Sequence, residues 1–340
     1  MFIPKRVIFE KGARDYPLGE ELYQKFKQDE SVSIFEASTN QVKKHIPGED
    51  LPAQYKAGKQ TLVVGVKKSL KFQSCKPSAH YQLPLVSGCM GQCEYCYLNT
   101  QLGDKPFVRV HVNLDEIIGQ ADKYVNERLP DITWFEGAAT SDPLPVEPYT
   151  RALEKCIVHF GKSENSRFRF VSKYNYVDNL LDLPHNGHTE IRFSLNTPYI
   201  IKEYEHYTAP SRARIKACSK LAARGYTVGF IIAPVFIYPG WKEDYLALLQ
   251  DIRENFPTNL VSPLMFEVIS HRYTARAKVR INEIFPSNSL PMTDEERTFK
   301  FGQFGYGKYV YTKEEMREIK EFFLEHINAI FPNADLKYII

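Results

Sequence analysis

The sequence has 340 residues, is 43% hydrophobic, and carries 44 Lys and Arg against 41 Asp and Glu, so its net charge is only +3. A chain of this length buries enough apolar surface for one large domain or two ordinary ones, which excludes a disordered protein or a small disulfide scaffold. No apolar stretch approaches the length of a membrane span, and residues 1–6 lack the apolar core of a signal peptide. We therefore expect a cytoplasmic protein with no membrane partner.

The first part of the chain has the pattern of a small α/β subdomain. Strand-like runs occur at 6–10, 31–36 and 61–66, and a helical pattern lies between the first two. We expect this N-terminal subdomain to span residues 1–80.

Three cysteines with the spacing C-x3-C-x2-C follow a short apolar strand at 82–86, namely Cys89, Cys93 and Cys96. A [4Fe–4S] cluster is normally held by four thiolates, so three of them leave one iron open to a ligand that is not protein. Zinc also binds thiolates, but structural zinc sites are usually built from two separated cysteine pairs, and the sequence has no second pair. The alternative to a cluster site is a chance grouping of cysteines or a redox-labile loop. The other thiols are interpreted as core or bystander residues: Cys75, Cys156 and Cys218.

From Tyr81 to about residue 270, strand patterns alternate with helical patterns. Helices are expected near 113–129, 147–160, 176–183, 212–224 and 242–255, and strands at 132–135, 167–172, 190–196, 226–235 and 260–269. Alternation of this kind predicts parallel βα units, which either close into a barrel or form an open sheet. Both arrangements place the chemistry at the carboxyl ends of the strands, and the pattern does not separate them.

A C-terminal extension over residues 271–340 carries basic and aromatic sequences. The segment 271–280 has four cations and no acid, including Arg272 and Arg276, and the predicted helix at 211–224 has five cations and no acid. One such run usually marks a solvated surface, but two of them favour phosphate contacts and a nucleic-acid partner.

Aromatic residues alternate with glycines over 300–311, which predicts a β-hairpin. Such a hairpin could place Tyr306 in a base step of DNA and Lys308 on a phosphate. An ordinary aromatic hairpin packed on the rest of the protein is the alternative. A helix at 313–328 and a strand at 334–340 end the chain.

The cysteine spacing, with Tyr95 before and Tyr97 after the last cysteine, resembles the radical S-adenosylmethionine superfamily. The resemblance implies a [4Fe–4S] cluster and S-adenosylmethionine as cofactors. It also selects an incomplete (β/α)6 barrel over 81–270, with the cysteine loop after its first strand.

Together with the segment 135–142 and the glycine–aromatic hairpin, these residues make the whole chain resemble the spore photoproduct lyase family. That family repairs 5-thyminyl-5,6-dihydrothymine in the DNA of germinating spores with an adenosyl radical. The resemblance therefore implies a DNA partner that carries this lesion, a reductant such as flavodoxin or ferredoxin, and a location in the spore core.

The resemblance also implies roles for individual residues. Tyr95 and Tyr97 match residues that relay hydrogen, while Ser141, Lys173, Ser194 and Asn196 are expected to contact S-adenosylmethionine.

One position departs from the family. Ala139 stands where the lyases carry the cysteine that returns hydrogen to the product radical. We interpret it as an engineered substitution that leaves radical formation intact and impairs clean thymine formation.

Two other interpretations of the whole chain stay open. One is a radical enzyme with an RNA, peptide or small-molecule substrate, and the other is a non-catalytic metal-stabilised DNA-binding module.

Overall fold

The computed structural model describes residues 1–257, 260–301, 305 and 307–340, and this chain forms two compact units. Unit 1 comprises 1–91, 101–172 and 176–190, and unit 2 comprises 92–100, 173–175 and 191–340. Each unit is assembled from separated segments, and the three consecutive domains expected from the sequence stay a prediction. Among the described residues, no helix combines the length and the apolar character needed to cross a bilayer.

The first sheet of unit 1 has the strand order β2-β1-β3-β8-β6. Its strands are β1 (Arg6–Glu10), β2 (Ser33–Ala37), β3 (Thr61–Gly65), β6 (Val86–Ser87) and β8 (Val108–His111). The three predicted strands are confirmed. The sheet nevertheless continues beyond residue 80, because β8 pairs in parallel with β3 and buries Val108 and Val110 in the same core.

Unit 1 also contains β4 (Ser74–Cys75), β5 (Ala79–Gln82), β9 (Thr133–Glu136) and β10 (Ser166–Ser172). β5 and β10 both pair in parallel with β9, and Phe135 stacks on Phe160 in the core behind them. The helices of this unit are α1 (Pro17–Lys27), α2 (Leu51–Lys59), α3 (Leu114–Arg128), α4 (Glu147–Thr150) and α5 (Ala152–Gly161).

Two predicted helices of unit 1 differ in the structure. The helix expected over 147–160 is divided into α4 and α5, because Arg151 between them has a left-handed φ of 48°. The helix expected over 176–183 is a single 3-10 turn at Asp178–Leu180.

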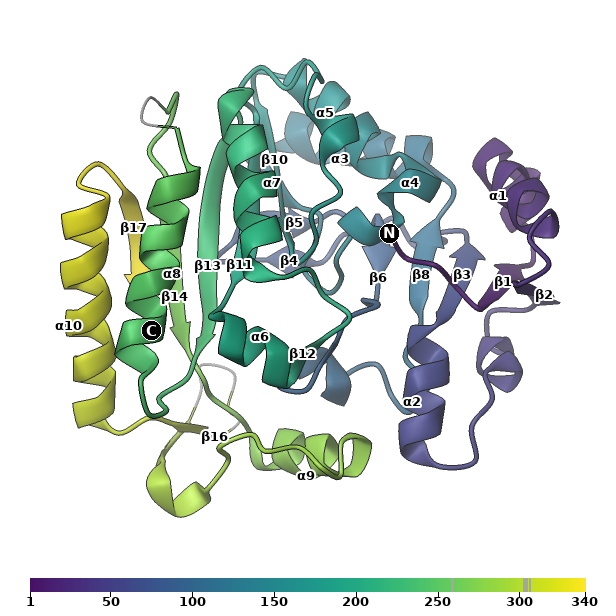
Figure 1. The fold of residues 1–340 in the computed structure, drawn as a ribbon. Helices are drawn as coiled ribbons and strands as arrows, with labels where there is room; N and C mark the ends of the chain where they lie inside the picture. The colour runs from purple at the N-terminus through teal and green to yellow at the C-terminus, as the bar shows by residue number, and fades with distance from the viewer. Residues whose placement is uncertain (258–259, 302–304, 306) are drawn as a thin grey trace. The chain divides into compact units, whose positions relative to one another are not determined.

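Unit 2 contains the strands that follow, β11 (Thr189–Leu195), whose first two residues belong to unit 1, β13 (Thr227–Val235), β14 (Met265–Ser270) and β17 (Asp335–Ile339). β14 pairs in parallel with β13 and with β17. The helices are α6 (Pro198–Tyr204), α7 (Ser211–Ala223), α8 (Trp241–Asn255), α9 (Ala275–Ile284) and α10 (Lys313–Ile330). Figure 1 shows α8 and α10 side by side next to these strands, where Lys242 of α8 and Glu318 of α10 form an ion pair.

Two short antiparallel pairs complete unit 2. β7 (Gln92–Cys93) pairs with β12 (Glu205–His206), and β15 (Thr298–Phe301) pairs with β16 (Gly307–Val310). The second pair is the predicted hairpin, and residues 302–304 and 306 between its strands lie outside the described residues. The first pair brings the cysteine segment of unit 2 to the end of α6.

Candidate active site

The cysteine loop begins in unit 1 at a glycine that nothing larger can replace. Gly88 has a φ of +77°, and a Cβ built on it would lie 2.1 Å from the carbonyl oxygen of Phe107. Its backbone N–H donates to the carbonyl of Thr140 (3.2 Å), and Gly88 forms a bridge with Ser141. The predicted cluster ligand Cys89 therefore lies next to the segment after β9 that carries Ala139 and Ser141.

The other two cysteines belong to unit 2. The side-chain amide of buried Asn99 donates to the carbonyls of Cys93 (3.1 Å) and Glu94 (3.0 Å), and the N–H of Cys96 donates to Cys93 (3.2 Å). Asn99 thus holds this half of the loop, a role that no sequence signal indicated.

The thiols present suit an iron–sulfur cluster in number and chemistry. None of the three is in a disulfide, and the N–H of Gly91 donates to the sulfur of Cys89 (3.3 Å), as backbone amides do for cluster sulfurs. Within the described part of the chain, no three His, Cys, Asp or Glu side chains are grouped as a metal site. The cluster assignment therefore rests on spacing, chemistry and family.

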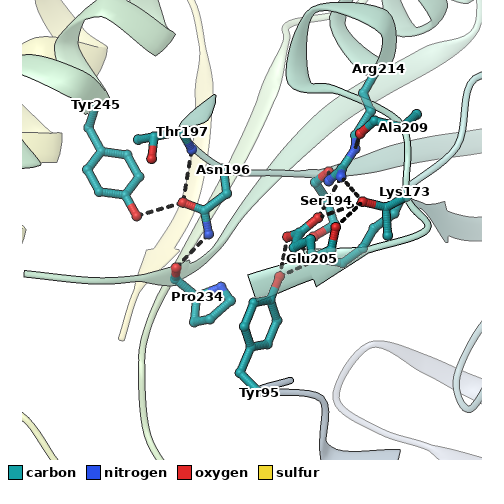
Figure 2. A network of polar contacts seen from close by, with 11 residues as sticks. Tyr95, Lys173, Ser194, Asn196, Thr197, Glu205, Ala209, Arg214, Pro234 and Tyr245 are labelled. Carbon is teal, nitrogen blue, oxygen red and sulfur yellow. Dashed lines mark hydrogen bonds and ion pairs between the residues drawn. The ribbon is translucent and has the colours of Figure 1, made fainter. Parts of the chain in front are cut away.

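Figure 2 shows a buried polar network in unit 2 that is centred on Glu205. The Lys173 ammonium lies 2.6 Å from Glu205 Oε1 and 2.6 Å from the Tyr95 hydroxyl, and Tyr95 donates to the same carboxylate oxygen. Arg214 binds the other oxygen through Nη2 at 2.5 Å. Two predicted site residues, Tyr95 and Lys173, are thereby brought together by two residues that the sequence did not single out.

Electrostatics keep this network charged. Burial alone would raise the pKa of Glu205, but the charges of Arg214 and Lys173 outweigh burial and lower it to about 2. Burial and the Glu205 carboxylate raise the pKa of the Tyr95 phenol well above its ordinary value. Tyr95 is therefore a neutral phenol whose hydroxyl is fixed by two charged groups.

Ser141 has the orphaned polar atom of the site. Its Oγ is buried and has no hydrogen-bond partner among the described residues. Its neighbours are engaged, since Gln82 donates to Thr140 Oγ1 (2.9 Å) and Ser172 donates to Asp142 (2.9 Å). The hydroxyls of Thr133, Ser166 and Thr189 are likewise buried without a partner among the described residues, so the Ser141 hydroxyl is available to a ligand but does not by itself require one. This observation fits the predicted contact with S-adenosylmethionine.

The two residues expected at the end of β11 are held by the protein itself. The Asn196 side chain donates to Pro234 (2.7 Å) and accepts from Tyr245 (2.7 Å), as Figure 2 shows, and the Ser194 carbonyl accepts from Arg214 (2.9 Å). These bonds fix β11 to its surroundings in unit 2. A cofactor contact for either residue stays a prediction.

The tyrosines on either side of Cys96 differ in environment. Tyr95 is half-buried against Phe236, with 5.9 Å between ring centroids, whereas Tyr97 is 53% exposed. The Tyr95 hydroxyl belongs to the network around Glu205.

The predicted DNA-contacting residues lie partly on the hairpin. Lys300 and Lys308 are direct cross-strand neighbours, and burial together with the charges of Arg272 and Lys300 lowers the pKa of Lys308. Like charges placed opposite each other destabilise a hairpin and suit an anionic ligand. Phe301 nearby is 78% exposed. Tyr306 lies outside the described residues.

The helices supply fewer free cations than the sequence indicated. Arg272 and Arg276 are exposed before and in α9, but Lys278 is paired with Asp294 at 2.9 Å. Of the five cations predicted for α7, Arg214 points inward to Glu205 and is fully buried, whereas the other four are exposed: Arg212, Lys216, Lys220 and Arg224.

Comparison with known proteins gives one family. Residues 2–340 match the family described as "Spore photoproduct lyase". The chain is 53% identical over 336 residues to the spore photoproduct lyase of Clostridium acetobutylicum and 44% identical over 337 residues to that of Bacillus subtilis, covering 99% of this chain and 98% of each relative.

Solved structures agree with these matches over the full length. A spore photoproduct lyase complexed with dinucleoside spore photoproduct has a TM-score of 0.94 and 46% identity, with 100% of this chain and 99% of that chain covered. A variant with one cysteine-to-alanine and one serine-to-cysteine substitution, bound to AdoMet and the same dinucleoside, gives the same values. The predicted α/β fold class, the incomplete barrel of this family, is thereby confirmed.

Proposed function

Because the chain belongs to the spore photoproduct lyase family, we propose that it repairs the spore photoproduct in DNA to two thymines with a radical made from S-adenosylmethionine. The observation that carries the proposal is full-length similarity to structures bound to this lesion, joined to the C-x3-C-x2-C motif. A reductant such as flavodoxin or ferredoxin and a place in the spore core follow from the resemblance alone.

Cys89, Cys93 and Cys96 would hold the [4Fe–4S] cluster, and Ser141 and Lys173 would bind S-adenosylmethionine. When bound, the two cofactors supply the 5′-deoxyadenosyl radical that takes hydrogen from C6 of the lesion. Lys173 is proposed for the methionine carboxylate because an ammonium has three N–H groups, although its contacts with Glu205 and the Tyr95 hydroxyl, each at 2.6 Å, compete for them. The orphaned Ser141 hydroxyl offers a further bond to the cofactor.

The hairpin supports a DNA substrate better than a small molecule or a peptide. Lys300 and Lys308 concentrate positive charge on one ladder, with the exposed rings of Phe299 and Phe301 beside them. Cations on phosphates combined with apolar groups at base steps are typical of proteins that distort DNA. A lesion must leave the base stack to reach a radical, and a damaged pair costs less to extrude.

Repair also requires a hydrogen donor for the product radical, and Ala139 has none to give. We propose Cys75 for this role. The AdoMet-bound relative carries a serine-to-cysteine substitution and, later in its sequence, a cysteine-to-alanine substitution. Cys75 and Ala139 of this chain have the same order and the same separation in sequence. This chain therefore carries in its own sequence the pair of residues that was introduced there, which offers an account of Ala139 other than an engineered loss.

The contacts of unit 1 support this assignment. Glu136 at the end of β9 accepts from Ser78, three residues after Cys75, and from the N–H of Ala138, next to Ala139 (3.3 and 3.2 Å). Cys75 is half-buried, whereas Cys156 and Cys218 are fully buried. In the proposed step the S–H bond of Cys75 breaks and a C–H bond of thymine forms. Tyr95 and Tyr97 would return hydrogen to the adenosyl group, the role that the resemblance gives them.

The function is tested by anaerobic incubation of the reconstituted, reduced protein with S-adenosylmethionine and a dinucleotide that carries the lesion. Chromatography is expected to show restored thymine dinucleotide, and Cys93→Ala is expected to show none. Cofactor cleavage without any thymine in the unaltered chain would contradict the lyase function.

The donor is tested by the same assay with two variants. Cys75→Ala is expected to keep 5′-deoxyadenosine formation and to lose most of the thymine, and adding Ala139→Cys to it is expected to restore thymine. An unchanged thymine yield in Cys75→Ala would exclude Cys75 as the donor.

A further inference from the structure

Lys59, the last residue of α2, is a buried cation beneath the cysteine loop of unit 1. It is only 2% exposed, and its ammonium donates to the carbonyls of Cys89 and Gly91, each at 2.8 Å. The ring of Tyr55 lies 5.3 Å from the same nitrogen. One side chain thus binds both ends of the tripeptide that carries the first cluster cysteine.

The position of Lys59 is fixed by the fold. α2 begins at the Asp50 cap, whose carboxylate accepts from the N–H of Ala53 at 2.8 Å, and ends where β3 starts at Thr61. Gly58 packs so tightly that a Cβ there would lie 2.2 Å from the Pro106 carbonyl. The ammonium therefore cannot swing to solvent without moving the helix.

Among the described residues, Lys59 has no carboxylate partner, and its contacts are the two carbonyls and the Tyr55 ring. A buried charge without a counter-charge is costly, by several kcal/mol even after relaxation. Carbonyl dipoles offset only part of that cost. The site is therefore built for an additional anion next to Cys89.

We propose that Lys59 is the counter-charge of the iron–sulfur cluster and the positioning residue of its loop. An oxidised [4Fe–4S] cluster with three thiolates carries a net negative charge, and reduction adds another. A fixed cation stabilises the reduced state more than the oxidised state, because the attraction grows with the cluster's charge. Lys59 should therefore raise the reduction potential and ease electron entry.

This inference rests on the proposed function only for the presence of the cluster, and it is independent of the lesion. The test is the reduction potential of the reconstituted protein, measured by redox titration with electron paramagnetic resonance detection. Lys59→Met removes the charge with little change in volume, and Lys59→Arg keeps the charge. Lys56→Met, on the exposed face of the same helix, is the matched control.

We expect Lys59→Met to lower the equilibrium constant for reduction of the cluster about tenfold. For a one-electron couple this is a reduction potential lower by about 59 mV. Lys59→Arg and Lys56→Met should stay close to the unaltered protein. If Lys59→Met failed to hold any cluster while Lys59→Arg held one, the counter-charge would also be supported. An unchanged potential in Lys59→Met, even with a lower melting temperature of the cluster-free protein, would overturn the proposal and leave only a structural role. A lesion assay without repair would not affect this result.

Discussion

Glu205 and Arg214 form an ion pair in which both side chains are fully buried, with Nη2 and Oε2 2.5 Å apart. The pair fixes the carboxylate that binds Lys173 and Tyr95, so the positions of these two residues, for which cofactor binding and hydrogen relay are proposed, depend on one interior charge pair. Breaking a buried pair by removing one partner leaves an uncompensated charge.

Arg214→Met is therefore expected to lower the free energy of unfolding by about 3–5 kcal/mol. Urea denaturation of the cluster-free protein measures this change. Arg212→Met, an exposed position on the same helix whose partner Asp251 is 3.7 Å away, should change stability by less than about 1 kcal/mol. Equal changes in the free energy of unfolding for the two variants would contradict a larger contribution of the buried Glu205–Arg214 pair to stability.

Ser141→Ala is expected to weaken S-adenosylmethionine binding without changing the stability of the protein. Because the Ser141 hydroxyl has no protein partner among the described residues, its removal should leave the free energy of unfolding within about 0.5 kcal/mol. The loss of one hydrogen bond to S-adenosylmethionine should weaken binding by roughly fivefold to tenfold, about 1 to 1.5 kcal/mol. Calorimetric titration of the reconstituted protein measures the affinity. Ser172→Ala, which removes a bond to Asp142, should instead lower stability; unchanged cofactor affinity in Ser141→Ala would refute the contact.

The hairpin lysines are expected to act on DNA affinity through salt. Lys300→Gln and Lys308→Gln should each weaken binding to lesion-free and lesion-containing duplexes alike, and each should reduce the slope of log affinity against log salt by about 1. Lys27→Gln, exposed at the last residue of α1, serves as the control. Fluorescence anisotropy over a salt series gives the slopes, and slopes that match the control would remove the hairpin from the DNA interface.

Glu147 makes stability depend on pH. Burial raises its pKa to about 7, although the N–H groups of Leu153 and Glu154 donate to it. The folded state then binds the proton more tightly than the unfolded chain, so stability is lost as pH rises from about 4.5 to 7. Glu147→Gln should remove this loss, which amounts to about 3.4 kcal/mol at most. Unfolding free energies of the cluster-free proteins at pH 5 and pH 8 measure the difference, and parallel pH profiles for both proteins would contradict it.

Much of the fold follows from periodicity. The strand predicted at 6–10 is β1, and the helix predicted at 212–224 is α7 within one residue at each end. β8 escapes prediction, because its place in the sheet depends on pairing with β3, which lies far earlier in the sequence. The break between α4 and α5 depends on one left-handed residue, Arg151, whose conformation is not encoded by its residue type.

The cysteines of the site could be predicted from the sequence because three thiols in eight residues have few structural explanations. The burial of Lys59, Glu205 and Arg214 could not be predicted, because a charged residue in a sequence carries no sign of its burial. Only the fold turns the basic pattern of α7 into one buried arginine and a set of surface charges. The charge pattern of α7 therefore predicted a nucleic-acid interface, although one of its charges, on Arg214, stabilises the interior of the protein.

The lyase function is tested most directly with a dinucleotide lesion deuterated at C6, incubated anaerobically with the reduced protein and S-adenosylmethionine. Mass spectrometry should find deuterium in 5′-deoxyadenosine, and this product should form faster with the lesion than without it. Unlabelled 5′-deoxyadenosine formed at the same rate with and without the lesion would contradict hydrogen abstraction from the lesion and would leave a radical enzyme with another substrate.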